Sequence, residues 1–305
     1  DQADQLARHL LRADMSGFPT QGVAKLTGTE PLQRITPVHD VRIERDTKLS
    51  QLLNAGAHPA PLVSYRATDV AIGKAREHGF GIVGVHNTFS SNGPQAYYAE
   101  RIAAQDLIGI VMARSPGAVA PFGSAAPLFG TNPIGFSFPT LAEPLVFDMS
   151  TSAMNWYGLV LAKAKGQPIP DNIAIDRDGR VTTDPGEAMS GALLPWDCSY
   201  KGSGLGLVIE LMAGPLAASA YCDCTTFDKD WGSTFIAIDP GLLVDVERFK
   251  SDCSGLIATV QASRKKPDVS TLRLPGTRSR TAYEKAAKSG IVEADEGTLR
   301  ELGWI

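Results

Sequence analysis

L-F-G-T-N-P-I-G-F-S-F-P-T-L-A-E-P-L-V-F-D, residues Leu128–Asp148, decides the fold, and it runs on into M-S-T-S at Met149–Ser152. The pattern predicts a turn hinged on Gly130 and Pro133, a short alternating strand, a polar loop, and a second apolar strand that ends in a carboxylate. Asp148 and the hydroxyl groups that follow it could hold a polar ligand at the strand end. The alternative is that they only close turns and cap a helix, and spacing alone favours this alternative.

Hydrophobic periodicity extends the prediction to the rest of the chain. Helical spacing predicts helices over residues 2–13, 60–78, 97–105, 154–164, 205–220 and 244–262. Short β-branched runs bounded by turn residues predict strands at 41–44, 81–86, 107–113 and 234–239. Residues 50–60 have the composition of a loop. The uneven alternation of strands and helices favours a mixed or largely antiparallel sheet over regular parallel βαβ units.

Composition and charge exclude several classes of protein. The chain has 305 residues, 43% hydrophobic and 20% charged, which is ordinary for a globular protein and argues against disorder. A net charge of −4 gives no reason to expect nucleic acid or an anionic membrane as a partner. The most apolar segment, 205–221, contains Glu210 and Pro215 and is short for a membrane span, so we expect a buried helix there.

Cysteine usage and the first residues indicate the compartment. Cys222 and Cys224 have C-x-C spacing without a second pair, so no metal site is expected, and thiols in a cytoplasmic protein are the default interpretation. No signal peptide is visible. The chain starts inside a helical pattern, so residues upstream of Asp1 could be missing.

Few residues stand out as chemical candidates. There is no Rossmann fingerprint, P-loop or H-E-x-x-H motif. His58, in a loop with glycine and proline, and His86, at a strand end, are the histidines best suited to acid–base chemistry. Lys201 in Y-K-G-S-G could reach a phosphate or carboxylate. Arg278 and Arg280, expected in a loop, are either phosphate ligands or surface charges.

Seven sequence blocks, in order, carry a resemblance that covers nearly the whole chain. They are H-N-T-F-S-S-N-G (86–93), L-F-G-T-N-P-I (128–134), F-D-M-S-T-S-A (147–153), T-T-D-P (182–185), G-A-L-L-P (191–195), Y-K-G-S-G-L (200–205) and L-P-G (274–276). Together they resemble the malate/L-lactate dehydrogenase family of nicotinamide-dependent oxidoreductases.

The resemblance implies a non-Rossmann α/β fold with a mixed, largely antiparallel sheet flanked by helices. It implies a helical and dimerisation lobe from residues 1–50 together with 245–305, and a cofactor- and substrate-binding lobe from 51–244. It further implies a homodimer and NADP or NAD as cofactor. Two arginines close together favour NADP, because a 2′-phosphate suits guanidinium partners.

The resemblance also implies site residues. Thr131 should contact the substrate. The residues expected along the cofactor are Ser90, Ser91, Asn92, Gly93, Pro94, Gln95, Asp148, Met149, Ser150, Thr151, Ser152, Lys201, Arg278 and Arg280.

This chain departs from the family pattern at the residues that would donate the proton and bind the substrate. The family usually has S-H-G-V-x-R where this chain has T-Q-G-V-A-K, residues Thr20–Lys25. The histidine is the family's proton donor, and Gln21 cannot deliver a proton at neutral pH. Lys25 keeps the positive charge of the family's carboxylate-binding arginine, but it cannot make the two parallel hydrogen bonds of a guanidinium group. Trp156 and Asp197 also stand at changed positions, which indicates a rebuilt pocket.

The leading hypothesis is an NAD(P)H-dependent reductase of a small carboxylate-bearing cyclic imine or 2-keto acid. A protonated imine needs no strong acid. Gln21, Thr20, Lys25, His58 and Asp197 are the catalytic candidates, and Lys25, Thr131 and Trp156 would bind the substrate. The alternatives are a lyase, decarboxylase or cyclase on the same fold, with His58, His86 or Asp197 as acid or base, or a cofactor-binding paralogue without activity.

Overall fold

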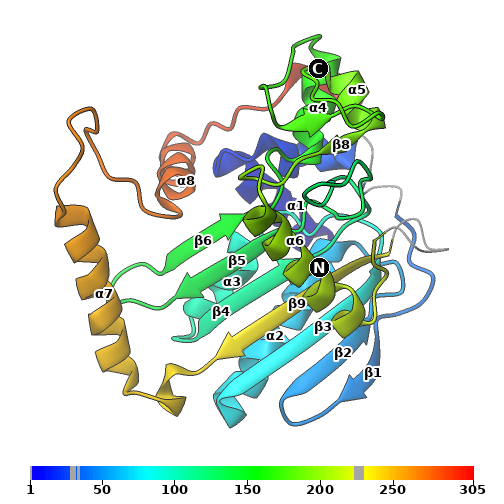
Figure 1. Ribbon diagram of the computed structural model, residues 1–305. Coiled ribbons are helices and arrows are strands. Elements are labelled where there is room, and N and C mark those ends of the chain that lie inside the picture. The colour runs from blue at the N-terminus through cyan, green and yellow to red at the C-terminus, as the bar shows by residue number, and fades with distance from the viewer. Residues whose placement is uncertain (1, 28–31, 33–34, 223–229) are drawn as a thin grey trace.

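The computed structural model describes residues 2–27, 32, 35–222 and 230–305. In this part of the chain, seven strands form one sheet in the order β1-β2-β3-β9-β4-β5-β6 (Figure 1). The strands are β1 (Arg42–Asp46), β2 (Ser50–Asn54), β3 (Phe80–Thr88), β4 (Ile108–Ala113), β5 (Ile134–Phe138), β6 (Leu145–Met149) and β9 (Trp231–Ile238). Neighbouring strands are antiparallel apart from β2 and β3, which are parallel. The predicted fold class is confirmed.

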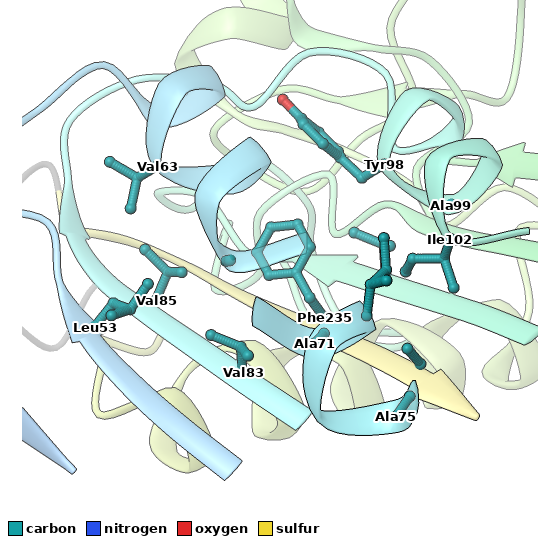
Figure 2. Packing of buried hydrophobic residues seen from close by; sticks show 14 of the residues in the cluster. Leu53, Val63, Ala71, Ala75, Val83, Val85, Tyr98, Ala99, Ile102 and Phe235 are labelled. Atoms are coloured by element: carbon teal, nitrogen blue, oxygen red, sulfur yellow. The ribbon is translucent and has the colours of Figure 1, made fainter. Parts of the chain in front are cut away.

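Helices α2 (Ala60–His78) and α3 (Ala96–Ala103) cover one face of the sheet. Figure 2 shows the core beneath them, where Ala71 and Ala75 of α2 pack among Val83 and Val85 of β3 and Phe235 of β9. The apolar residues of α2 recur at helical spacing, whereas those of β3 alternate. Small alanines on the helix let it lie close to the branched side chains of the strand.

The opposite face of the sheet is covered by α6 (Tyr200–Ala213), whose Ile209 packs with Met112, Ile134 and Ile236. A second, smaller core lies around a two-stranded sheet, β7 (Ala174–Ile175) with β8 (Ala192–Leu193). It is closed by helices α4 (Trp156–Ala164) and α5 (Pro185–Ser190).

The N-terminal and C-terminal segments of the chain pack against each other. Helix α1 (Gln2–Met15) packs against α2 and against α8 (Thr277–Ser289). Helices α7 (Val246–Ala262) and α9 (Glu296–Glu301) also belong to the C-terminal part. Since β1 pairs with β2, the sheet continues across position 50, and the two-lobe division of the chain stays a prediction.

Two local predictions were wrong. The expected loop at 50–60 contains β2, a strand too short for a clear alternating pattern that is stabilised by parallel pairing with β3. Helix α6 is not buried all round, because Leu207, Val208 and Leu211 are about half exposed. Hydropathy shows that a helix is apolar but not how many of its faces are covered. None of the described helices combines the length and apolar character needed to cross a bilayer.

Candidate active site

Gln21 and Lys25 are carried by two short 3₁₀ turns, η1 (Pro19–Gln21) and η2 (Val23–Leu26), that follow α1. Proline at the first position of η1 suits a turn start, since its missing N–H would have no partner there. The Lys25 N–H donates to the carbonyl of Gly22, the residue between the two turns, at 2.9 Å and closes η2. Both side chains thereby line the same cavity.

This substrate cavity, as we call it, has a volume of about 270 Å³ and gathers residues from distant parts of the chain. Its predicted members are Gln21, Lys25, Ser91, Thr131 and Trp156. The other lining residues are Ser115, Pro116, Gly117, Ala118, Asn155, Tyr157 and Trp231. The volume lies just below the range of about 300–1,000 Å³ typical of drug-sized ligands, so the space suits a small molecule.

The polar groups of the substrate cavity are arranged around Gln21 and Lys25. The Ser91 hydroxyl donates to Gln21 Oε1 at 3.2 Å, so the remaining polar group of that amide, the NH₂, can only donate. The Lys25 ammonium lies 5.7 Å from the centre of the Tyr157 ring. Burial raises the pKa of Tyr157 above its ordinary value, aided by the negative charges of Glu301 and Asp295. Among the described lining residues, Lys25 is the one with a formal charge.

The turn that presents Thr131 differs from the prediction in its physical basis. The residue with positive φ is Asn132 (37°), not Gly130. Gly130 is required for space, because a Cβ there would lie 2.4 Å from Ser115 Oγ and about as close to the Ser115 backbone. The turn at Gly130 therefore lies directly against the segment that follows β4. Thr151 Oγ1 donates to the carbonyl of Asn132 at 3.1 Å and fixes the other side of the turn.

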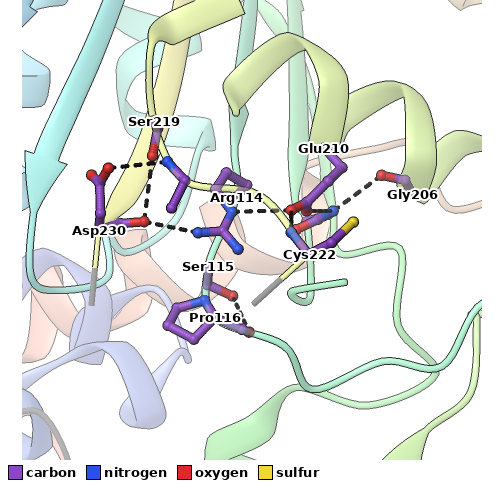
Figure 3. Close-up of polar contacts among 10 residues, drawn as sticks. Arg114, Ser115, Pro116, Gly206, Glu210, Ser219, Cys222 and Asp230 are labelled. Atoms are coloured by element: carbon purple, nitrogen blue, oxygen red, sulfur yellow. Dashed lines mark hydrogen bonds and ion pairs between the residues drawn. The ribbon is translucent and has the colours of Figure 1, made fainter. Parts of the chain in front are cut away.

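A buried polar network supports two walls of the substrate cavity (Figure 3). Arg114 Nε lies 3.2 Å from Glu210 Oε1, and both side chains are about 2% exposed. Glu210 Oε2 accepts from Asn132 Nδ2 at 2.7 Å, and Arg114 Nη1 donates to the Asp230 carbonyl at 2.8 Å. The network thus fixes the residues directly before Ser115 and directly after Thr131, so α6, β4 and the β5 turn hold one geometry.

A second cavity of about 660 Å³, the arginine cavity, lies between the C-terminal segment and β6. Among the residues that the structure describes, its charged lining residues are four arginines and four carboxylates: Arg12, Arg273, Arg278 and Arg280, with Glu100, Glu143, Asp148 and Glu284. Contrary to the prediction, Arg278 and Arg280 lie in the first turn of α8 rather than in a loop. Guanidinium groups match phosphate oxygens in charge and geometry, and the volume is that of a cofactor site. Arg273 and Arg278 could therefore bind a phosphate group, whereas Arg280 Nη2 donates to the Pro144 carbonyl at 2.8 Å.

The predicted cofactor loop is mostly committed to internal contacts. Ser90 Oγ accepts the Ala60 N–H at 3.0 Å, and Asn92 Nδ2 donates to Ser64 Oγ and Ser233 Oγ. Gln95 Nε2 donates to the Gly93 carbonyl. Ser91 lines the substrate cavity, whereas Gly93 and Pro94 line neither cavity.

The hydroxyl groups after β6 mainly form hydrogen bonds within turns, as in the alternative interpretation of that stretch. Ser150 Oγ lies 3.1 Å from Ser152 Oγ, and Ser152 Oγ donates to the Met154 carbonyl at 2.6 Å. These two serines close the turn between β6 and α4, whereas Thr151 Oγ1 donates to the carbonyls of Thr131 and Asn132. Met149 packs in the core beside α6. Of this group only Asp148 reaches a described cavity.

Several other candidates lie away from the substrate cavity. The Ser199 hydroxyl donates to Asp197 Oδ2, and the N–H groups of Ser199 and Gly202 donate to the same carboxyl; these hydrogen bonds lower its pKa, while Ser199 is the N-cap of α6. Lys201 is exposed on the first turn of α6. His58 lines a separate cavity beside α2. Thr20 is half-buried and lines neither cavity.

His86 Nε2 lies 2.9 Å from Glu44 Oε2, outside both cavities. Cys224 and its C-x-C spacing lie outside the described residues.

Sequence analysis missed Tyr157, Trp231 and Ser115 as lining residues. A signal existed for Ser115-Pro116-Gly117, since a turn motif directly after a predicted strand is a common place for a site. Tyr157 adjoins Trp156 at the helix start. Trp231 had no signal, because its approach depends on the antiparallel pairing of β9 between β3 and β4.

The raised pKa of the Asp148 carboxyl predicts that the free energy of unfolding depends on pH. Burial raises the pKa of its carboxyl from 3.8 to about 6, although the N–H groups of Ala96 and Gln95 oppose the shift. Because the folded pKa is the higher one, the stability that Asp148 contributes is present at low pH and lost as pH rises through about 6.

We expect Asp148→Asn to gain stability relative to the native chain between pH 4 and pH 7. The upper limit is on the order of 3 kcal/mol. Urea unfolding of both proteins at matched pH measures this difference. A difference that stays constant with pH would contradict the assignment.

Comparison with known proteins gives the family. The sequence model of the malate/L-lactate dehydrogenase family matches residues 1–303. The chain belongs to the malate/L-lactate dehydrogenase family.

Relatives agree over nearly the whole length. The L-sulfolactate dehydrogenase of Methanothermobacter thermautotrophicus is 33% identical over 99% of this chain and 89% of its own. The Δ1-pyrroline-2-carboxylate/Δ1-piperideine-2-carboxylate reductase of Pseudomonas putida is 32% identical over 81% and 73%. The solved sulfolactate dehydrogenase of Methanocaldococcus jannaschii superposes with a TM-score of 0.87 at 27% identity, over 99% of this chain and 88% of that one. The protein is therefore an oxidoreductase, and its family supports a nicotinamide cofactor.

Proposed function

We propose that this enzyme uses NAD(P)H to reduce a small cyclic imine that bears a carboxylate, with 2-keto acids as weaker substrates. The observation that carries the proposal is Gln21, which lines the substrate cavity where the family's proton donor is expected. An amide NH₂ can orient a substrate nitrogen or oxygen but cannot protonate it. A cyclic imine that is already protonated avoids this requirement.

The residues of the substrate cavity would divide the work of binding. Lys25 would pair with the substrate carboxylate, and Trp156 and Thr131 would bound the ring. Ser91 would keep the Gln21 amide in one orientation through the hydrogen bond described above. The cofactor would supply the hydride when bound.

We further propose NADP as the preferred cofactor, because Arg278 and Arg280 lie close together in the first turn of α8 and a 2′-phosphate suits guanidinium partners. By the same family resemblance we propose a cytoplasmic homodimer. Measuring the dissociation constants of NADPH and NADH by fluorescence titration tests the cofactor preference. Tighter binding of NADH would contradict it.

The proposed reaction is tested by NADPH oxidation with Δ1-piperideine-2-carboxylate, Δ1-pyrroline-2-carboxylate and pyruvate. Turnover should be highest with the two cyclic imines. Cofactor binding without turnover of any of the three would overturn the proposal and favour a lyase, decarboxylase or cyclase, or a binding protein without activity.

Lys25→Met tests how the carboxylate is held. Hydrogen bonds to charged groups contribute about 1.5–3 kcal/mol, so we expect KM for the imine carboxylate to rise about 10–100-fold. The dissociation constant of NADPH should not change, because Lys25 does not line the arginine cavity. Lys48→Met, in an exposed turn between β1 and β2, is the matched control. An unchanged KM would show that another group binds the carboxylate.

A further inference from the structure

Asp14 lies in the last turn of α1, directly against the turns that carry Gln21 and Lys25. Its Oδ2 accepts the Val23 N–H at 2.9 Å. A Cβ placed on Gly22 would lie 2.0 Å from Asp14 Oδ1, so the backbone at Gly22 rests on the carboxyl group. The φ of Gly22 is negative (−92°), so no left-handed backbone requires glycine here, and its lack of a side chain permits this close approach.

The Val23 N–H is the junction of the Gln21–Lys25 segment. Val23 begins η2, and the first N–H groups of a helical turn have no partner within the turn. Asp14 supplies that partner from another element. Gln21 directly precedes Gly22, and the Lys25 N–H donates to the Gly22 carbonyl. The Asp14 carboxyl group therefore anchors the backbone between Gln21 and Lys25.

The anchor is a carboxyl group although its site disfavours charge. Burial raises the pKa of Asp14 to about 6, and the Val23 N–H opposes the shift. A neutral asparagine could accept the same hydrogen bond without burying charge. A group whose burial works against its ionised form, beside a ligand cavity, is a candidate for a functional role.

We propose that Asp14 is a positioning residue, which holds the Thr20–Lys25 segment so that Gln21 and Lys25 face the substrate together. The proposal rests on the proposed function of the substrate cavity. Asp14 does not line that cavity, so it would act through the backbone of the segment and not on the substrate itself. A displacement of about 1 Å at a reacting group can lower the rate about 10²-fold, so the loss of this anchor should be visible in catalysis.

The direct test compares Asp14→Ala with Asp4→Ala, an exposed aspartate on the same helix. We expect Asp14→Ala to lower kcat/KM for the imine substrate by about 10–100-fold, through both kcat and KM. The dissociation constant of NADPH should stay at the native value. Equal losses in cofactor affinity and kcat/KM would indicate general structural damage and overturn the proposal, as would native kinetics.

A local readout separates this proposal from the proposed function. Hydrogen–deuterium exchange of the peptide that covers Pro19–Leu26 should speed up in Asp14→Ala and stay native in Asp4→Ala. This measurement needs no substrate, so it holds even if none of the three substrates is turned over. Native exchange in Asp14→Ala would show that Asp14 does not hold the segment.

Gly22→Ala tests the same contact from the glycine side. The new methyl would collide with the Asp14 carboxyl, so kcat/KM should fall. In the Gly22→Ala/Asp14→Ala double variant the collision is removed, and the combined loss should be smaller than the product of the single losses. Independent, multiplicative losses would overturn the contact between Asp14 and Gly22 as the positioning element.

Discussion

Gln21→His is expected to raise kcat/KM for pyruvate reduction by about 10²–10⁴-fold, because a positioned general acid contributes about this much to proton transfer. Gln21 lines the substrate cavity beside Lys25 and accepts a hydrogen bond from Ser91. An imidazole at this position would have a proton to give to a developing alkoxide, which the amide lacks. Reduction of Δ1-piperideine-2-carboxylate should change little, since its protonated nitrogen needs no donor.

The pH profile distinguishes acid catalysis from a change in packing. In Gln21→His the rate with pyruvate should fall above the pKa of the new imidazole, which is about 6.5 in an unperturbed histidine. His58→Gln is the companion variant, because His58 lines a separate cavity and we expect native rates from it. Gln21→His without any gain on pyruvate would contradict the assignment of this position. A large loss in His58→Gln would show that His58 takes part in the reduction although it lines a separate cavity.

Local order could be predicted from the sequence wherever the pattern was long or sharply bounded. The helix predicted over 60–78 coincides with α2, since its alanine stripe ends at a glycine with positive φ. The Leu128–Asp148 stretch forms the predicted hairpin of β5 and β6. The pairing of Gln21 with Lys25 in one site followed from the family resemblance, and the structure brings both side chains to one cavity.

Tertiary contacts limited the rest of the prediction. The N–H of Ala96 at the start of α3 donates to Asp148 Oδ2 at 2.9 Å, a contact between segments that no local pattern connects. Asp197 has a carboxyl group at a changed family position, yet its hydrogen bonds come from Ser199 and Gly202 at the start of α6. Trp231 enters the substrate cavity because β9 inserts between β3 and β4. Such roles depend on the register of the whole sheet.

Glu210, the charged residue inside the apolar segment 205–221, is another residue whose partner only the structure shows. Glu210 argued against a membrane span, but the sequence did not indicate its partner. In the structure Glu210 compensates Arg114, and Asn132 Nδ2 and the Cys222 N–H complete its hydrogen bonds. The carboxylate thus joins α6 to both segments that frame the substrate cavity.

Glu210→Gln is expected to lower the free energy of unfolding by about 3–5 kcal/mol, because it leaves a buried guanidinium without a counter-charge. Among the described residues, Arg114 donates a hydrogen bond only through Nη1, to the Asp230 carbonyl, so Glu210 is the group that balances its charge. Denaturation in guanidinium chloride measures the loss. Glu296→Gln, which breaks an exposed pair with Arg300, should leave the midpoint unchanged.

The double variant Arg114→Met/Glu210→Met separates charge from packing. Replacing both partners of a buried ion pair by apolar side chains of similar volume is often neutral or stabilising, so much of the lost stability should return. Catalysis should not return with it, because methionine does not replace the carboxylate to which Asn132 Nδ2 donates at 2.7 Å. The Thr131 turn would then have the Gly206 carbonyl as the remaining described partner of that amide. A double variant that recovers both stability and kcat/KM would show that the network serves the fold alone. One that recovers stability while kcat/KM stays low would show that the buried carboxylate also sets the geometry of the substrate cavity.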